Sequence, residues 1–258
     1  MILNRRQFLA YTGAAAAGAL LLPRSAFAAT TLSSFPVTIT LPGSYVIAAN
    51  HNLNLSLGAA ITVEADDVDI NFQGFSISNS AAGLDTAAVG VYAILRNRVR
   101  VRNGTLERFH TGVMLMGSQN AGGSIVEDLT LTDCTASGIL LSGAACIVQR
   151  NVMSFAERTT LFCTPPETAI LGIGLSRSPR SRVIDNVISF TNTGADDLAI
   201  ALYAGQNCDE LICLDNQLTG ADVGFVIDEA LDASAEMRDT ATTSVTTKSW
   251  GGTDLDTL

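Results

Sequence analysis

The chain has 258 residues, of which 47% are hydrophobic and 16% are charged, and it carries a formal net charge of −10 at pH 7. This acidic balance argues against nucleic acid and against an anionic membrane surface as partners. The length allows one domain with a continuous hydrophobic core.

The first 28 residues have the three regions of an export signal. Arg5 and Arg6 precede an Ala/Gly/Leu-rich stretch that ends in small residues at Ala28. The segment resembles a twin-arginine signal cleaved after Ala28, and its apolar part is short for a permanent membrane span. We therefore expect a periplasmic or secreted bacterial protein, not inserted in the membrane after cleavage, with one mature domain at residues 29–258. Removing the three signal arginines leaves 12 basic against 25 acidic side chains, a charge of −13.

A glycine followed by alternating apolar residues recurs at intervals of 22 to 34 residues, and a second short apolar element follows each repeat. The period-2 alternation and the β-branched residues predict strands, and the interval is that of one solenoid turn. The longest interval contains an insertion at residues 156–168. The repeats are GVYAIL from Gly90, GVMLMG from Gly112, GILLSG from Gly138, GIGLSR from Gly172, the looser AIALYAG from Ala199, and GFVIDE from Gly224.

Asn151, Asn186 and Asn216 fall at the same place in successive second elements, with Asn103 or Asp128 close to it in earlier ones. Side chains stacked there would lie about 4.8 Å apart and could hydrogen-bond along the solenoid axis. The pattern resembles the asparagine ladder of right-handed parallel β-helices, the pectate-lyase-like or parallel β-helix repeat family.

This resemblance covers roughly residues 37–228. It implies an all-β fold, a single right-handed parallel β-helix of roughly eight coils, in which the polar residues from about 229 to 258 cap or trail from the last coil. Because lyases, glycosidases and non-enzymatic envelope proteins all share this architecture, the resemblance implies no particular activity.

The strand alternation predicts which side chains face outward on the first sheet. With Val91, Val113, Ile139, Ile173, Ile200 and Phe225 inward, the outward face is apolar to small. It suits a polysaccharide or an envelope protein as partner, with self-association as an alternative. Outward residues are then Tyr92, Ile94, Met114, Met116, Leu140, Ser142, Gly174, Ser176, Ala201, Tyr203, Val226 and Asp228, of which Tyr92, Met114, Met116 and Tyr203 are candidate substrate-binding residues.

Two neighbouring carboxylates, Asp196 and Asp197, precede the repeat at 199, and Asp222 precedes the next one. The sequence GADDLAI resembles the Asp-Asp segment of polygalacturonases, which implies an acid and a water-activating carboxylate. The Gly-His-Gly and Arg-x-Lys segments of that family have no counterpart in this chain. We expect these residues to cap turns, and they are the catalytic candidates should the protein be an enzyme.

The sequence SRSPRSR places Arg177, Arg180 and Arg182 in one loop. Guanidinium groups bind carboxylates and sulfates in a bidentate manner, so Arg177 and Arg180 are further candidates for binding an acidic ligand. The alternative is a solvated loop without a ligand.

No cofactor is expected to be required, and metal ligands are not identified. Asp66, Asp67 and Asp69 form a turn that could also hold calcium, and His51 and His110 lie far apart in the coil order. The five cysteines lack metal-ligand spacing and are expected to be buried, with a Cys208–Cys213 disulfide as an alternative. They are Cys134, Cys146, Cys163, Cys208 and Cys213.

Two functions are compatible with these features. The favoured one is an exported envelope protein that binds a glycan or a protein partner on its solenoid face without catalysis. The alternative is a carbohydrate-active enzyme, a polysaccharide lyase or glycoside hydrolase, that uses the turn carboxylates beside that face.

Overall fold

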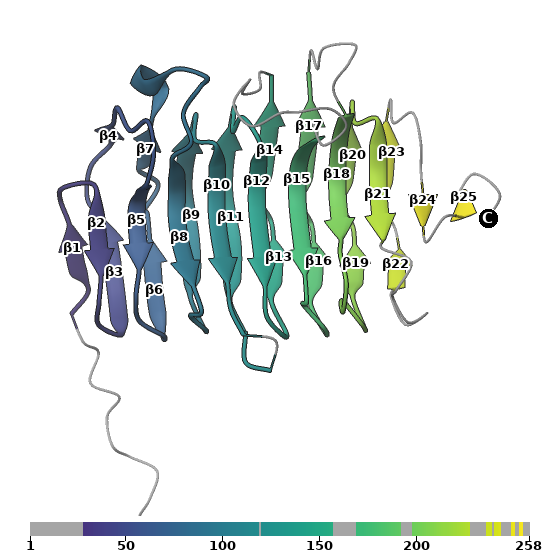
Figure 1. The fold of residues 1–258 in the computed structure, drawn as a ribbon, viewed down its shortest axis with the longest axis horizontal. Helices are drawn as coiled ribbons and strands as arrows, with labels where there is room; N and C mark the ends of the chain where they lie inside the picture. The colour runs from purple at the N-terminus through teal and green to yellow at the C-terminus, as the bar shows by residue number, and fades with distance from the viewer. Residues whose placement is uncertain are drawn as a thin grey trace, which may run out of the picture.

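The chain winds into a parallel β-solenoid whose strands stack side by side along one axis (Figure 1). The computed structural model describes residues 28–118, 120–156, 169–191, 198–227, 236–238, 240–243, 249–250 and 253–254. The predicted all-β parallel β-helix is confirmed. The predicted export signal lies almost entirely outside the described residues, so it stays a prediction.

The eight-stranded sheet, called sheet B here, takes one strand from each coil, and all neighbouring strands in it are parallel. Eight strands are separated by seven complete turns of the solenoid. Its strands in spatial order are β2 (Val37–Ile39), β5 (Ala59–Val63), β8 (Val89–Ile94), β10 (Thr111–Met116), β12 (Ser137–Ser142), β15 (Ala169–Ser176), β18 (Leu198–Ala204) and β21 (Val223–Ile227).

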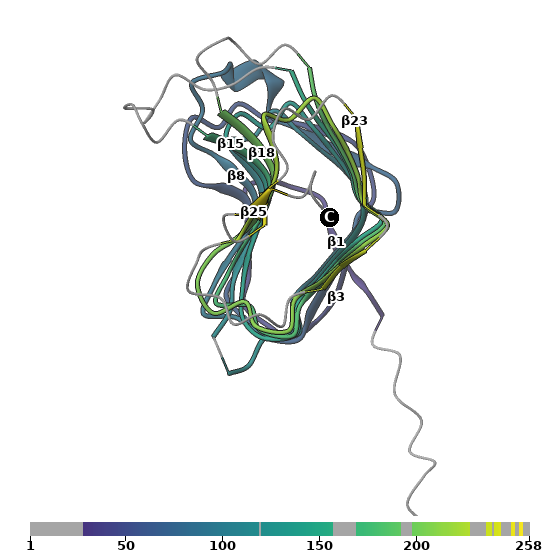
Figure 2. The ribbon, with the colours of Figure 1, turned by 90° about the vertical axis from the view of Figure 1, so that its right-hand side faces the viewer.

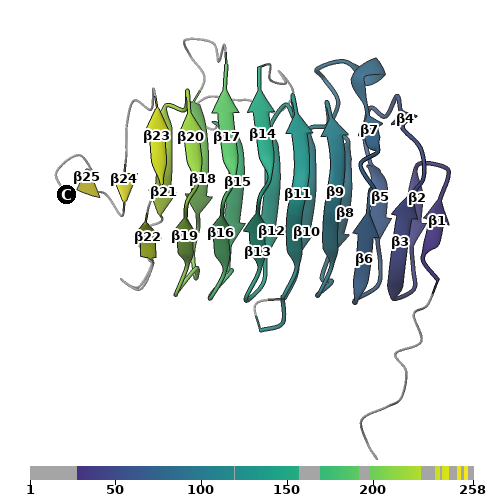
Figure 3. The same ribbon diagram turned by 180° about the vertical axis from the view of Figure 1, so that it is seen from behind.

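The fifteen-stranded sheet, called sheet A here, forms the opposite wall (Figure 3). One series of its strands is β1 (Thr30–Leu32), β3 (Gly43–Ile47), β6 (Val68–Asn71), β9 (Arg100–Glu107), β11 (Ile125–Thr132), β13 (Ile147–Gln149), β16 (Arg182–Ile184), β19 (Ile212–Leu214) and β22 (Glu236–Arg238). The others are β4 (His51–Asn52), β7 (Ser76–Ser78), β14 (Val152–Phe155), β17 (Val187–Phe190), β20 (Gln217–Thr219) and β23 (Ala241–Thr243). Outside both sheets lie a short 3-10 helix, η1 (Ser80–Ala82), and a two-stranded sheet of β24 (Ser249–Trp250) and β25 (Thr253–Asp254).

Each coil crosses sheet B once, and it crosses sheet A either in one long strand, as in β9 and β11, or in two short ones. In one coil, β12 leads through a turn to β13, and a corner at Asn151 leads on to β14. The view down the axis shows the two sheets enclosing a common interior, with sheet B bent inwards about midway along its strands (Figure 2). The interior is lined by columns of Val, Ile and Leu, because one coil alone cannot bury its inward row.

The inward column of sheet B confirms most of the predicted register and corrects one strand. Val113 pairs with Ile139, which pairs with Ile173, and all three are fully buried. In β18, however, Leu202 pairs with Ile173, whereas Ile200 had been predicted in this place. Ala201, predicted to face outward, is also fully buried.

The recurring glycines mark places where successive coils approach closely. A Cβ on Gly138 would lie 2.7 Å from the carbonyl oxygen of Gly172, and one on Gly172 would lie 2.5 Å from that of Ala201. Both distances are too short for a real side chain, so glycine is required by space. Ala201 thus continues the glycine column, and the predicted repeat start at Ala199 was two residues too early.

The predicted asparagine ladder is confirmed. Asn151 Nδ2 donates to Asn186 Oδ1 at 3.0 Å, and Asn186 Nδ2 donates to Asn216 Oδ1 at 3.0 Å. All three side chains are fully buried at one corner of sheet A. In two earlier coils, Asn103 and Asp128 lie one position before the ladder column, and both have a positive φ.

Candidate functional site

The outward face of sheet B is the feature that distinguishes this molecule. None of the eight strands of sheet B contains an Asp, Glu, Lys, Arg or His residue, on either face. The inward residues form the core, so the uncharged outward residues form an apolar surface in a chain of net charge −10. Such a contiguous surface usually marks a contact with a partner.

Strand pairing aligns the outward residues into two adjacent rows. Tyr92 pairs with Met114 and Met114 with Leu140, and further along Gly174 pairs with Tyr203 and Tyr203 with Val226. The second row contains Ile94 and Met116. Ile94 is 45% exposed, and the other side chains are half-buried. We call this surface the sheet-B stripe: Tyr92, Ile94, Met114, Met116, Leu140, Tyr203 and Val226.

Gly174 leaves a space in the stripe that Leu140 partly covers. A Cβ on Gly174 would lie 2.7 Å from Leu140 Cδ2. The ring of Tyr203 lies near Gly205, where a Cβ would be 3.2 Å from Tyr203 Cε1. Leu140 therefore extends over Gly174, and the ring of Tyr203 extends towards Gly205.

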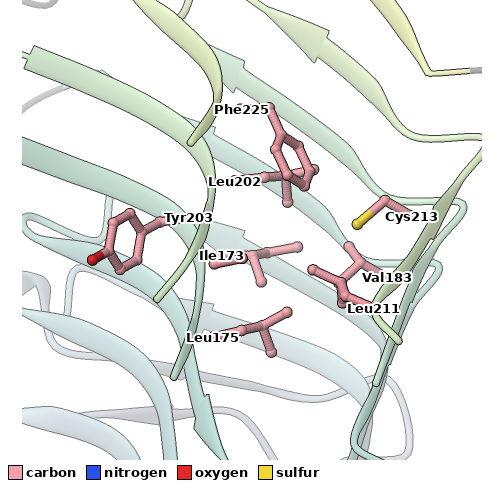
Figure 4. A pocket seen from close by; sticks show the side chains of 9 residues that line it. Ile173, Leu175, Val183, Leu202, Tyr203, Leu211, Cys213 and Phe225 are labelled. Atoms are coloured by element: carbon pink, nitrogen blue, oxygen red, sulfur yellow. The ribbon is translucent and has the colours of Figure 1, made fainter. Parts of the chain in front are cut away.

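The side chains of β18 point to two different sides of sheet B (Figure 4). Tyr203 points to the opposite side of the strand from Leu202, Ile173 and Leu175 (Figure 4). On the inner side, these side chains and Phe225 border a narrow space that has no room for a water molecule. This space belongs to the packing of the core and is no ligand pocket.

The predicted binding residues therefore lie where they were expected. Tyr92, Met114, Met116 and Tyr203 all belong to the sheet-B stripe, and their role in binding stays a prediction. Arg177 is exposed in the turn that follows β15, beyond the end of the stripe. Ile94, Leu140 and Val226 complete the stripe. Alternation within the strands had predicted that they face outward, but they were not among the named substrate-binding candidates.

The catalytic candidates are only partly described. Asp196 and Asp197 lie outside the described residues, as does Asp228, which was predicted only to face outward. Asp222 Oδ2 accepts a hydrogen bond from the backbone N–H of Ala199 at 2.8 Å. This bond links two neighbouring coils, because Ala199 lies 23 residues earlier in β18, whereas the prediction was a local turn cap.

The charged side chains gather instead on the outward face of sheet A. Glu127 accepts hydrogen bonds from Arg100, from Arg150 at 2.9 Å and from Gln149 at 2.6 Å. Burial alone would raise the pKa of Glu127, but the bonds from Gln149 and Arg100 and the nearby arginine charges lower it. Asp128 bonds to Arg150 at 2.8 Å, and this bond lowers the pKa of Asp128. These groups therefore stabilise the stack as ionised pairs.

The three carboxylates considered for calcium have separate partners. Asp67 forms a bidentate ion pair with Arg98, and Asp69 forms another with Arg102 at 3.0 Å. Asp66 Oδ1 accepts the backbone N–H of Asn97 at 3.0 Å. Their protein partners therefore use the carboxylate oxygens that a cation would need.

The thiols and imidazoles are mostly enclosed. Cys134, Cys146, Cys208 and Cys213 are free and buried, so the alternative of a Cys208–Cys213 disulfide is wrong, while Cys163 lies outside the described residues. Burial raises the pKa of Cys134 to about 12 and that of Cys146 to about 11.

The two histidines also lie in different environments. His51 lies against Phe35 with ring centroids 4.6 Å apart. His110 is half-buried before β10, and burial lowers its pKa.

Comparison with known proteins identifies the family. The model of the family described as "Periplasmic copper-binding protein (NosD)" matches residues 44–236, most of the solenoid. The chain belongs to the NosD family. No curated protein and no solved structure matches the chain.

Membership of the NosD family confirms the periplasmic location that the export signal predicted. It also specifies the predicted β-helix resemblance more closely than the pectate-lyase-like group did. Among the described residues, none lies in a helix with the length and apolar character of a membrane span.

The family description corrects the expectation that no cofactor is required, because the NosD family is described as copper-binding. The described residues contain no group of three or more His, Cys, Asp and Glu side chains arranged to hold a metal ion. Met114 and Met116 present soft thioethers on one face of β10, but a pair of donors falls short of a copper centre. The described residues therefore do not fit such a centre.

Proposed function

We propose that the chain is a periplasmic scaffold that binds a partner protein along the sheet-B stripe. The observation that carries this proposal is the absence of any charged residue from the eight described strands of sheet B. Depletion of charge together with Tyr and Met is the composition of the buried part of protein interfaces.

The dimensions of the stripe suit an extended or helical segment of a partner. Its first row runs from Tyr92 on β8 to Val226 on β21, across six neighbouring strands. At about 4.8 Å between strands, the row is about 24 Å long. It lies on a preformed, hydrogen-bonded sheet, so binding orders little of the scaffold itself.

The side-chain chemistry favours a protein over a glycan. A glycan offers many hydroxyl groups that require directional hydrogen bonds, whereas Met114, Met116 and Leu140 have no hydrogen-bond donor. Methionine side chains adapt to apolar partners of different shape. The hydroxyl groups of Tyr92 and Tyr203 lie in different parts of the row, with Met114 and Leu140 between them.

Site-specific photocrosslinking in the periplasm tests the proposal. A benzophenone side chain at Met114 should form one discrete protein adduct, while the same group at Thr130, which is exposed on sheet A, should not. Adding Leu140→Asp should abolish the adduct, because it places a charge in the middle of the apolar row. Adducts of equal yield from both positions, or an adduct insensitive to Leu140→Asp, would overturn the proposal. An adduct of the chain with itself would identify self-association instead.

A further inference from the structure

The turn between β15 and β16 lies beside the corresponding turns of the neighbouring coils (Figure 1) and is hydrogen-bonded to them. Ser178 Oγ donates to the carbonyl oxygen of Ser176 at 3.1 Å, and Ser181 Oγ accepts the backbone N–H of Cys146 at 3.1 Å. Both Ser178 and Ser181 are fully buried. In the sequence SRSPRSR, buried serines thus alternate with arginines that reach the surface.

Backbone hydrogen bonds tie the turn to the next coil as well. The N–H of Arg177 donates to the carbonyl oxygen of Gln206 at 2.7 Å, and the N–H of Arg180 donates to that of Asp209 at 2.7 Å. Arg177, Arg180 and Arg182 are exposed. The turn therefore presents three guanidinium groups from a fixed backbone.

These arginines differ from the other arginines on the solenoid surface. Arg98 and Arg102 form bidentate pairs with aspartates on the preceding coil, and Arg150 pairs with Asp128. Within the described part of the chain, no carboxylate bonds to the guanidinium of Arg177, Arg180 or Arg182. These three arginines thus lack the bidentate carboxylate pairing of Arg98 and Arg102, although the turn of the next coil carries Asp209 and Glu210.

The cationic turn continues into an apolar patch on sheet A. Arg182 pairs in the sheet with Ile147 on one side and with Ile212 on the other. Ile184 lies two residues further along β16 on the same face. These three isoleucines are half-buried, so part of each side chain remains accessible.

We infer that Arg177, Arg180 and Arg182 bind an acidic segment of the partner protein. The inference rests on the proposed function: the turn begins at the end of β15, beside the sheet-B stripe, and leads around the edge of the solenoid to sheet A, where the same partner is to reach Arg182. Three guanidinium groups select carboxylates through charge-assisted, bidentate hydrogen bonds. The adjacent isoleucines favour a polypeptide, since it can place apolar side chains beside its carboxylates, whereas a uronic acid polymer cannot.

Fluorescence anisotropy with a labelled peptide of alternating glutamate and leucine tests the inference on the whole mature protein. The variant Arg177→Gln/Arg180→Gln/Arg182→Gln should bind the peptide on the order of tenfold more weakly or worse, as expected for the loss of several charge-assisted bonds. A control with the same net charge, Arg98→Gln/Arg102→Gln/Arg150→Gln, should bind it as the wild type does. Circular dichroism establishes that each variant is folded.

Competition decides the class of partner. Polygalacturonate and phosphatidylglycerol vesicles should compete poorly with the peptide. Three outcomes would overturn the inference. The two triple variants could bind the peptide equally, the wild type could fail to bind it, or polygalacturonate or the vesicles could compete with it at equal charge. The Met114 crosslink tests the stripe separately. If the crosslink forms but the peptide test fails, only the acidic-segment inference is refuted. If no crosslink forms with Arg177, Arg180 and Arg182 intact, the proposed function is refuted.

Discussion

Asn151 and Asn186 form the central rung of the ladder: Asn186 Oδ1 accepts hydrogen bonds from both the Nδ2 and the backbone N–H of Asn151, at 3.0 and 3.1 Å. Both residues are fully buried. The corners of the coils that contain Asn151, Asn186 and Asn216 are therefore joined by buried side-chain hydrogen bonds.

Asn186→Ala should lower the free energy of unfolding by about 1–3 kcal/mol, because it leaves two buried donors of Asn151 without an acceptor. Urea denaturation measures the change. Gln217→Ala, at an exposed position of β20, is the matched control and should change stability by less than about 0.5 kcal/mol. Equal effects of the two substitutions would contradict the structural role of the ladder.

The glycines provide a second pair of substitutions with similar geometry and opposite expectations. A Cβ at Gly138 would lie 2.7 Å from a backbone oxygen, whereas one at Gly174 would lie 2.7 Å from the end of the Leu140 side chain. A flexible side chain can move aside and a stacked backbone cannot. Gly138→Ala should therefore cost about 1–3 kcal/mol in thermal unfolding, and Gly174→Ala less than about 0.5 kcal/mol. The reverse order would show that the coils can separate.

The buried thiols should resist modification in the folded protein. Only thiolate reacts with Ellman's reagent, and with the pKa of Cys134 raised to about 12 by burial, about one molecule in ten thousand is ionised there at pH 8. In a Cys163→Ser variant, labelling of all four remaining thiols should follow global unfolding in rising urea. Rapid labelling of any of them in the native protein would disprove their enclosure.

Glu127 should contribute to the loss of stability in acid. The pKa of Glu127 is lowered in the folded protein, so its stabilising effect is present above the unfolded value of about 4.3 and is lost as the pH falls through the folded pKa. Glu127→Gln should lower stability at pH 7 by about 1 kcal/mol, since the arginine partners are partly exposed and screened. Its stability should also vary less with pH below about 4.5. Exposed Glu64→Gln is the control, and a wild-type pH profile in Glu127→Gln would refute this role.

Substitutions of Asp222 distinguish a structural role of this carboxylate from a catalytic one. As a cap for the N–H of Ala199, it should tolerate replacement by asparagine, which keeps an acceptor oxygen, while Asp222→Ala should cost about 1 kcal/mol. If Asp222 were a catalytic carboxylate, both substitutions should abolish turnover. Unfolding curves and a reducing-sugar assay on polygalacturonate give the answer: turnover by the wild type that Asp222→Asn abolishes would support the enzyme.

Periodic features were predictable because every coil repeats them. The asparagine ladder and the inward columns follow from residues at regular places, such as Asn151 and Val113. The predicted register of β18 was wrong because the alternation of small and apolar residues in AIALYA fits the repeat in two alignments that differ by two residues. Only the close approach of coils, which requires Gly172 to face Ala201, distinguishes the two alignments.

The sequence by itself determined the solenoid and the apolar outward face of sheet B, since both depend on alternation within single strands. The tertiary structure decided which charges are paired. The arginine–aspartate pairs across coils join residues separated by 22 to 33 positions, because the turns differ in length. No fixed spacing in the sequence therefore distinguishes the paired Arg98 from the unpaired Arg180; only the stacking of one coil on the next does.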